Sequence, residues 1–381
     1  MGLDLGLEQE GIEILLACEI DQAARNTIKL NRPDIALIGD IRDYSATEIR
    51  ERAGLSPTED IDLIVCNPPD SIFDLSDKQL VLNGQNNLFL KFIDLISELQ
   101  PKFIVIETMP ELLNLSSPNI SNLIKKINHP TLCQEKEIGN IFSFVIHRLE
   151  AAEYGISFNF YNAADFGSPQ QRSSIFIVCN RDGKKLPYLT PTHTNNSLNE
   201  LPEWQTLRDA IGKTPGNEHR SDEFLKEGLR KISIEDKNRI ISLCQRLDWD
   251  KPSPRLLAEM MFSNNLVHPE ADRWLNIEEC KRIQELPDDW QIVGHLGYSY
   301  TYLNSQYRLL GNATPCSLGR AIARMLMTYL EPEESMSYAK KIEKIENIFK
   351  SIETLGEWEK EVHSFNPLSQ YEKYFQIATS K

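Results

Sequence analysis

Four short apolar runs, separated by longer amphipathic stretches, most constrain the fold of this chain. ILLACEI lies within residues 11–21, and similar runs lie in residues 61–69, 102–108 and 173–180. Between them stand helical patterns such as residues 87–99, where apolar residues recur at helical spacing. Strands that alternate with helices are typical of a doubly wound sheet. The sequence therefore predicts an α/β fold with a mostly parallel, doubly wound sheet.

Polar and proline residues gather where these predicted strands end. Glu19, Glu107 and the run Pro68-Pro69-Asp70 all lie at or just past strand ends. Ligands of open α/β sheets bind at the carboxyl ends of the strands. We therefore expect these residues to share one rim of the sheet.

Composition narrows the class of protein. The 381 residues are 41% hydrophobic and 25% charged, and the sequence shows neither a membrane span nor a secretory signal. The seven cysteines form no CxxC pair, which argues against zinc and disulfides and favours a reducing cytoplasm. The net charge of −15 gives no bulk support for nucleic-acid binding, although a local DNA surface is compatible with it. We expect a cytoplasmic protein without a metal or a membrane partner.

The pattern changes in the second half of the chain. Residues 181–290 begin with a loop rich in Pro, Asn and Thr and are predicted to form a small domain. Residues 291–331 return to the first domain, residues 1–180, and contain an amphipathic helix at 317–330. The tail at 332–381 has heptad-like apolar spacing, which favours a helix packed on its own domain over a docking helix for a partner.

Seven segments in order resemble the motifs of bacterial restriction–modification DNA cytosine-5 methyltransferases. VCNPPDSIF resembles the nucleophile loop, usually Gly-Gly-Pro-Pro-Cys-Gln-x-Phe-Ser, and IETM stands where the family has Glu-Asn-Val. Seven motifs in the right order are a specific signal, whereas one would be weak. The other matching segments are residues 5–21, 39–43, 162–178, 273–290 and 307–315.

This resemblance implies a Rossmann-like methyltransferase sheet with a target-recognition domain, S-adenosyl-L-methionine as cofactor and double-stranded DNA as partner. In the family a cysteine thiolate adds to C6 of a flipped-out cytosine, and C5 then takes the methyl group. Glu107 resembles the acid that contacts N3 of the base. Gln170 and Arg172 resemble residues of the active-site segment Gln-x-Arg-x-Arg.

The same resemblance implies a set of cofactor residues. Glu19 resembles the acid that holds the ribose hydroxyls, Asp40 the residue near the adenine amino group, and Asn312 a residue of the closing cofactor motif. Pro68 belongs to the nucleophile loop, and Gly2 matches the last glycine of the Phe-Ser-Gly-x-Gly-Gly cofactor loop.

The family's first strand, which is central in its sheet, and most of that glycine loop have no counterpart in the sequence. Either the natural start lies upstream, or the sheet lacks its middle strand, or another segment fills it. We therefore expect cofactor binding to be weakened or lost.

The sequence departs from the family most sharply at Asp70, which occupies the position of the nucleophilic cysteine. A carboxylate is a much weaker nucleophile toward C6 than a thiolate. Cys66 lies four residues earlier and is expected to be a small buried residue rather than a substitute. Loss of the second arginine of Gln-x-Arg-x-Arg removes a bidentate cation. The further departures are Ser71, Asp74, Gln85, Thr108, Met109 and Ser174.

In the predicted recognition domain, residues 201–211 and 246–257 resemble the start and middle of known target-recognition domains. Arg255 follows Pro-Ser-Pro and is a candidate DNA contact, although a surface arginine without this role is the favoured interpretation. The bases read by this domain do not follow from its residues.

Three functions compete. The preferred hypothesis is a methyltransferase homologue that is inactive alone, a pseudoenzyme, because several independent parts of the mechanism are altered. The second is a non-catalytic DNA-recognition subunit that works with a second methyltransferase chain, and the third is an active enzyme with an altered sequence. A Rossmann oxidoreductase shares the fold, but no GxGxxG follows a predicted strand.

Overall fold

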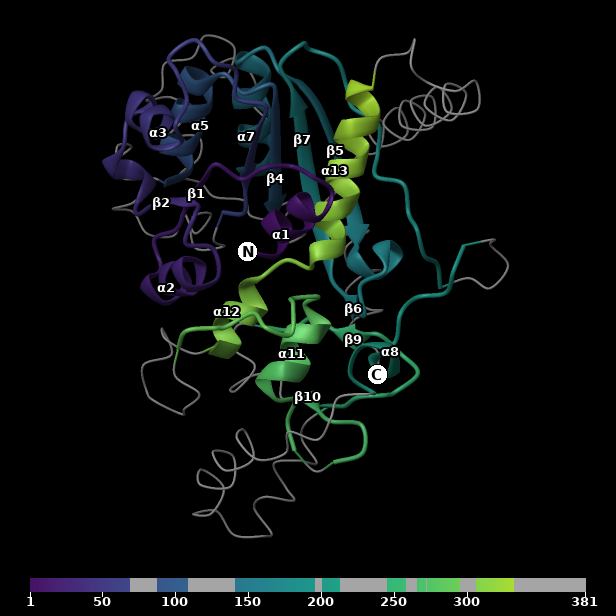
Figure 1. Cartoon of the computed structure of the whole chain (residues 1–381). Helices are drawn as coiled ribbons and strands as arrows, with labels where there is room; N and C mark the ends of the chain where they lie inside the picture. The colour runs from purple at the N-terminus through teal and green to yellow at the C-terminus, as the bar shows by residue number, and fades with distance from the viewer. Residues whose placement is uncertain are drawn as a thin grey trace. The chain divides into compact units, whose positions relative to one another are not determined.

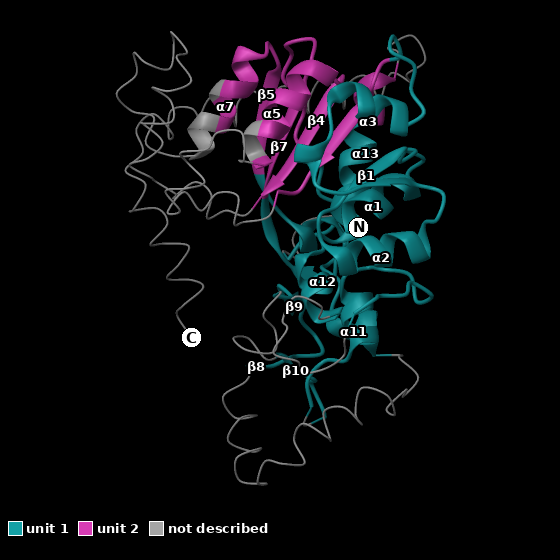
Figure 2. Ribbon diagram, turned by 90° about the vertical axis from the view of Figure 1, so that its left-hand side faces the viewer, with its two compact units in different colours: residues 1–59, 160–174, 189–326 teal, residues 60–159, 175–188, 327–381 magenta. Residues whose placement is uncertain are grey.

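Two compact units make up the chain, and Figure 2 colours them separately. Unit 1 comprises residues 1–59, 160–174 and 189–326, and unit 2 comprises residues 60–159, 175–188 and 327–381. The boundaries of these units differ from the domain boundaries expected from the sequence. The expected functional domains remain a prediction. The computed structural model describes residues 1–68, 88–108, 141–195, 201–212, 245–257, 266–271, 273–294 and 306–331.

A four-stranded mixed sheet has the strand order β3-β4-β7-β5 (Figure 1). Its strands are β3 (Leu63–Cys66), β4 (Phe103–Thr108), β5 (Gly155–Asn162) and β7 (Ser173–Asn180). β3 runs parallel to β4, and every residue of β4 is buried, as expected for a central strand. The strands predicted within residues 61–69, 102–108 and 173–180 are therefore confirmed.

The direction of β7 differs from the parallel arrangement expected for it. β7 pairs antiparallel with β4, with Phe103 opposite Asn180 and Thr108 opposite Ile175. A parallel neighbour needs a crossover connection of about a dozen residues or more, usually a helix. The segment 163–172, which links β5 to its neighbour β7, is too short for that and contains only the 3-10 helix η5 (Ala163–Phe166) and the short strand β6 (Gln170–Gln171).

Two helices of unit 2 are built on apolar stripes. α5 (Leu88–Leu99) confirms the helix predicted over residues 87–99, and α7 (Ile141–Ala151) follows later in the chain. The buried side chains of α5 recur at helical spacing, which identifies its inward face: Phe92, Ile93, Leu95, Ile96 and Leu99.

The N-terminal part of unit 1 contains a separate two-stranded parallel sheet. β1 (Leu16–Cys18) confirms the predicted strand within residues 11–21 and pairs with β2 (Ala36–Ile38), with Leu16 opposite Ala36. α2 (Gln22–Asn31) connects them and starts at Asp21, whose carboxylate accepts a hydrogen bond from the Ala24 amide at 2.8 Å. Within the described residues, β1 joins no strand other than β2.

The first helix, α1 (Gly2–Gln9), packs against α13 (Cys316–Leu330) through glycines. A Cβ added at Gly6 would lie 2.0 Å from the Cys316 carbonyl oxygen, and one added at Gly319 would lie 2.3 Å from the Leu3 carbonyl oxygen. Only glycine permits this backbone approach. α13 also confirms the amphipathic helix predicted at residues 317–330.

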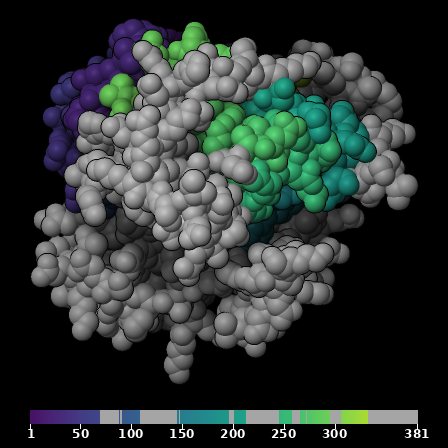
Figure 3. Space-filling view, turned by 90° about the horizontal axis from the view of Figure 1, so that it is seen from below, coloured from purple at the N-terminus to yellow at the C-terminus, as the bar shows by residue number. Residues whose placement is uncertain are grey.

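The region predicted as a small domain shares one hydrophobic core with α1 and α12 in unit 1. This core contains Leu5 of α1 and Leu310 of α12 together with Leu207, Leu256 and Ile283. Figure 3 shows the teal and green atoms of this region gathered on one face. Its short elements are α8 (Leu207–Ile211), β8 (Gln245–Arg246), β9 (Ser253–Pro254), β10 (Leu266–Val267) and α11 (Ile277–Ile283), and α12 (Gln306–Asn312) follows it in the chain.

Candidate active site and DNA interface

The candidate catalytic acid lies at the end of β4. Glu107 is only 2% exposed, and the side-chain amide of Asn67 donates a hydrogen bond to its Oε2 atom. β3 and β4 are parallel, and Cys66 pairs with Ile106. Asn67 and Glu107 are therefore the next residues along these two neighbouring strands. Pro68 is buried beside them in the chain, whereas Asp70 lies outside the described residues. Asn67 lies within the nucleophile-loop segment VCNPPDSIF, but the sequence analysis gave it no role.

Gln170 and Arg172 are both buried in unit 1 and hold parts of the backbone in place. The Arg172 guanidinium donates to the carbonyl oxygens of Gly311 at 3.1 Å and Ala313 at 2.8 Å. The Gln170 side-chain oxygen accepts a hydrogen bond from the Leu256 amide at 3.4 Å. The described contacts therefore give these two motif residues a structural role, whatever they do for a substrate.

Two acidic residues follow the strands of the β1–β2 sheet. Glu19 is half-exposed, and its Oε1 atom accepts a hydrogen bond from the Asp21 amide at 2.8 Å. Asp40 follows β2 and accepts hydrogen bonds from the Arg42 side chain at 2.9 and 3.0 Å. The Arg42 side chain thereby lowers the pKa of the Asp40 carboxyl below its ordinary value. Glu19 and Asp40 lie just past the ends of the two paired strands of the small sheet.

The residues predicted to bind the cofactor differ in their exposure and contacts. A carboxylate accepts up to about four hydrogen bonds, so Glu19 retains capacity for sugar hydroxyls beyond the Asp21 amide. Asn312 is exposed at the end of α12. Gly2, by contrast, is buried in α1, where an added Cβ would lie 1.7 Å from the Thr314 carbonyl oxygen. Close packing alone therefore requires a glycine there.

The strand-end residues that were expected to share one rim of the sheet belong to different units. Glu19 and Asp40 belong to unit 1 together with Gln170 and Arg172, whereas Glu107 belongs to unit 2. Within unit 1, Asp21 at the start of α2 also forms an ion pair of 2.6 Å with Arg308 of α12.

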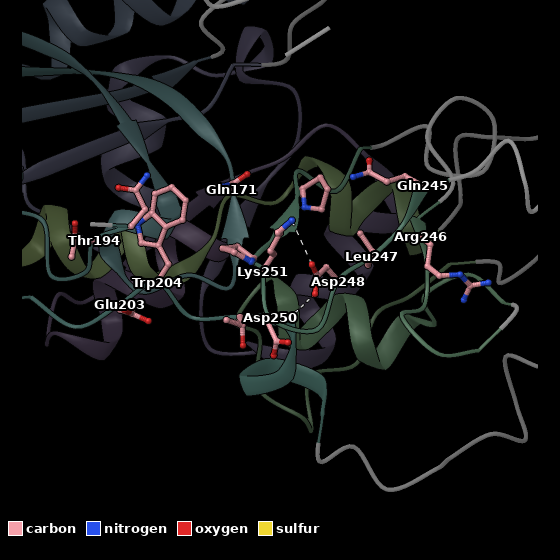
Figure 4. Close-up of a pocket in the computed structure, with 14 residues that line it drawn as sticks. Gln171, Thr194, Glu203, Trp204, Gln245, Arg246, Leu247, Asp248, Asp250 and Lys251 are labelled. Atoms are coloured by element: carbon pink, nitrogen blue, oxygen red, sulfur yellow. Dashed lines mark hydrogen bonds and ion pairs between the residues drawn. The ribbon is translucent and has the colours of Figure 1, made fainter. Parts of the chain in front are cut away.

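A cleft of about 530 Å³ opens in unit 1 beside the pair of strands β6 and β9 (Figure 4). Gln171 of β6 pairs with Pro254 of β9, which places the predicted active-site segment next to the predicted recognition domain. Trp204 contributes an aromatic side chain, and its indole N–H donates to the Asp165 carboxylate at 2.9 Å. We call this the β6–β9 cleft.

Charges of both signs line the β6–β9 cleft. The carboxylates are Glu203, Asp248 and Asp250, and the cations are Arg246 and Lys251. Asp248 accepts a hydrogen bond from the Asp250 amide at 3.0 Å and pairs with Lys251 at 3.4 Å, and both interactions lower the pKa of its carboxyl. The cleft is therefore polar but not strongly basic. Its lining residues include members of three segments singled out in the sequence, namely residues 162–178, 201–211 and 246–257.

Arg255, the candidate DNA contact, is half-buried rather than a surface residue. Its Nε atom is buried without a hydrogen-bond partner among the described residues. In the described part of the chain, no helix is long and apolar enough to cross a membrane. The same residues include no group of three or more His, Cys, Asp or Glu side chains that could hold a metal ion.

Comparison with known protein families settles the relationship. The model of the C-5 cytosine-specific DNA methylases matches residues 1–328. This chain belongs to that family. The resemblance to DNA cytosine-5 methyltransferases that the sequence showed is thus confirmed, and the α/β fold agrees with it.

Two curated relatives of this methylase are type II methyltransferases. M.AquIA of Picosynechococcus is 31% identical over 225 residues, which cover 56% of this chain and 85% of the relative. M1.HphI of Haemophilus parahaemolyticus is 26% identical over 353 residues, covering 86% of this chain and 84% of the relative. The methylase is therefore homologous to cytosine-5 methyltransferases of restriction–modification systems.

A solved structure shows the same fold. The Dnmt2 methyltransferase of S. pombe superimposes with a TM-score of 0.56 over 87% of this methylase and 96% of its own chain, at 15% identity. At that identity the likeness concerns the fold alone.

Proposed function

We propose that this chain is a restriction–modification cytosine-5 methyltransferase homologue that binds DNA but does not transfer methyl groups on its own. The observation that carries the proposal is Asp70, which stands directly after Pro68-Pro69 where the family has its cysteine. Thiolate addition to C6 is what makes C5 reactive, and a carboxylate supplies that step poorly. The protein would thus keep the scaffold while lacking the nucleophile.

The family cofactor, S-adenosyl-L-methionine, supplies an electrophilic methyl group when it is bound. Glu19 and Asp40 would hold its ribose and adenine. We expect weaker binding than in the relatives, because the Asp40 carboxylate is already engaged by Arg42 and Gly2 is packed against Thr314.

The β6–β9 cleft is our candidate for DNA contact, in the cytoplasm where such DNA is found. Its three carboxylates disfavour phosphate groups, but carboxylates accept hydrogen bonds from cytosine amino groups. Trp204 offers a face for stacking, and Gln171 offers both a donor and an acceptor. The cleft therefore suits base edges better than the DNA backbone.

The direct test incubates the purified chain with tritium-labelled S-adenosylmethionine and unmethylated genomic DNA. We expect no label in DNA from the natural chain. An Asp70→Cys variant is the matched comparison, and label transferred by this variant alone would identify Asp70 as the block. Methyl transfer by the natural chain would refute the proposal.

A second function, the non-catalytic half of a split methyltransferase, is favoured by one observation on β3. Among the described residues β3 is the terminal strand of its sheet, and its four apolar residues Leu63–Cys66 are all only half-buried. A terminal apolar strand can accept a further strand from another chain. Affinity purification from the native host, followed by mass spectrometry, tests this. Recovery of a second methyltransferase chain with an intact Pro-Cys loop supports it, and recovery of the chain alone counts against it.

A further inference from the structure

We propose that Asn67 acts as an internal substitute for the target base by occupying the carboxylate of Glu107. This inference rests on the proposed function, because it assigns Glu107 to a base-binding pocket. In this proposal the Asn67 side chain competes with a flipped-out cytosine for the Glu107 carboxylate.

The geometry of the strand ends carries the argument. β3 and β4 are parallel, with Val65 opposite Val105 and Cys66 opposite Ile106, so the next residues along the two strands are Asn67 and Glu107. The Asn67 amide nitrogen donates to Glu107 Oε2 across this pair. Because neighbouring parallel strands hold their ends in register, the contact is built into the sheet rather than into a loop.

Burial makes the contact consequential. Glu107 is 2% exposed, whereas Asn67 is exposed. A buried carboxylate is costly unless hydrogen bonds compensate it, and the amide supplies such a bond. A ligand that uses Glu107 must first displace this bond or share the carboxylate with it.

The chemistry of the amide matches that of the expected ligand. The asparagine side chain presents an NH₂ group with two donors beside a carbonyl acceptor. Cytosine presents an exocyclic amino group as a donor, and thymine presents a carbonyl oxygen in the corresponding place. A carboxylate that accepts from the Asn67 amide can likewise accept from the cytosine amino group, whereas the thymine carbonyl oxygen at the corresponding position has no hydrogen to donate.

The family motif has a different residue at the position of Asn67. The usual nucleophile loop reads Gly-Gly-Pro-Pro-Cys, and Asn67 stands at its second glycine. Glycine has no side chain, so that motif leaves the neighbouring acid open to a base. An internal donor also acts at a higher effective concentration than a group on another molecule.

The first experiment tests the contact itself. The side-chain amide signals of Asn67 are assigned by NMR in the natural full-length chain and in an isosteric Glu107→Gln variant. We expect slowed proton exchange and a downfield amide proton in the natural chain, and loss of both in the variant. Identical Asn67 signals in the two proteins would overturn the proposal.

The second experiment tests competition with a base. Fluorescence anisotropy measures binding to mixed-sequence duplexes that carry either a cytosine or a thymine opposite an abasic site. We expect Asn67→Gly to tighten binding of the cytosine duplex about tenfold, since a hydrogen bond to a charged group is exchanged, and to leave the thymine duplex unchanged. The double variant Asn67→Gly, Glu107→Gln is the matched control and should lose the gain.

The outcomes separate this proposal from the proposed function. Equal affinities of the natural chain and Asn67→Gly for the cytosine duplex would overturn the competition. If none of the proteins binds DNA, the proposed DNA-binding function fails, and the NMR result still decides whether Asn67 occupies Glu107. Asn67 is exposed, so its replacement by glycine leaves the core intact.

Discussion

Two regions with family motif residues have fared differently in this chain. In the segment Gln-x-Arg-x-Arg, Gln170 and Arg172 remain and hold backbone groups of distant segments, while Ser174 replaces the second arginine. At the neighbouring strands β3 and β4, Glu107 remains, and its carboxylate accepts a hydrogen bond from the Asn67 side chain. The retained residues of the first region thus contact backbone groups, so we expect their replacement to affect mainly the stability of the fold.

The largest effect that tests this comparison is expected for Arg172→Ala. The change leaves the buried carbonyl oxygens of Gly311 and Ala313 without this donor, so we expect a loss of about 3 kcal/mol in the free energy of unfolding. Urea denaturation measures it. Arg324→Ala is the matched control, because its ion pair with Glu10 is exposed and is worth less than about 1 kcal/mol. Equal losses in both variants would break the comparison.

A second substitution asks whether packing also explains the glycines of α1. Gly6→Ala places a Cβ about 2.0 Å from the Cys316 carbonyl oxygen, which forces α1 and α13 apart. We expect a loss of about 1–3 kcal/mol in the free energy of unfolding, measured by urea denaturation without cofactor. Lys29→Ala on the exposed side of α2 serves as control. An unchanged urea midpoint for Gly6→Ala would remove packing as the reason for glycine.

A third prediction extends the comparison to His268, a buried residue of the recognition region. Its Nδ1 accepts hydrogen bonds from the amides of Glu270 at 3.2 Å and Ala271 at 3.1 Å, so the folded state needs the neutral ring. Burial lowers the pKa of His268, with opposing effects from nearby Glu279 and Arg273. Since the unfolded chain binds the proton more readily, stability is full above about pH 6.5 and falls as the pH drops below it.

The check on His268 is a pair of urea denaturations at pH 7.5 and pH 5.5. We expect the natural chain to be less stable at pH 5.5 than at pH 7.5, because protonation of His268 is disfavoured in the folded state. His268→Gln should show a smaller loss over the same interval. The same loss in both proteins would assign the pH dependence to other groups.

The smallest effect on stability is expected at the β6–β9 cleft. Lys251 is exposed and pairs with Asp248 at 3.4 Å, so Lys251→Ala should change the free energy of unfolding by less than about 0.5 kcal/mol. Its effect should appear instead as weaker DNA binding in fluorescence anisotropy, with Lys29→Ala as the unaffected control. A large loss of stability would place Lys251 with the packing residues.

The sequence was sufficient for elements whose apolar pattern is continuous. β4, β7 and α5 lie within the predicted ranges and α13 begins one residue earlier than predicted, because each buries a face that local spacing reveals. β5 was missed, although Ile156, Phe158 and Phe160 alternate as a strand requires.

Long-range pairing was beyond the reach of local patterns. The antiparallel direction of β7 follows from the short link to β5, not from the composition of either strand. The contact of Asn67 with Glu107 depends on strand register across forty residues of sequence. The shared core of Leu5, Leu207 and Leu310 likewise joins segments that read as separate domains.

The hydrogen bonds of Arg172 also have a consequence during protein synthesis. Gly311, the acceptor residue that comes first in the sequence, is 139 residues further along the chain than Arg172. At a ribosomal rate of about 5–20 residues per second, Arg172 emerges roughly 7–28 s before its partner exists. During that interval the charged Arg172 side chain, in the segment leading into β7, lacks the carbonyl acceptors that it has in the folded protein. The nascent chain must therefore keep this segment hydrated, or shielded by a chaperone, until α12 leaves the ribosome.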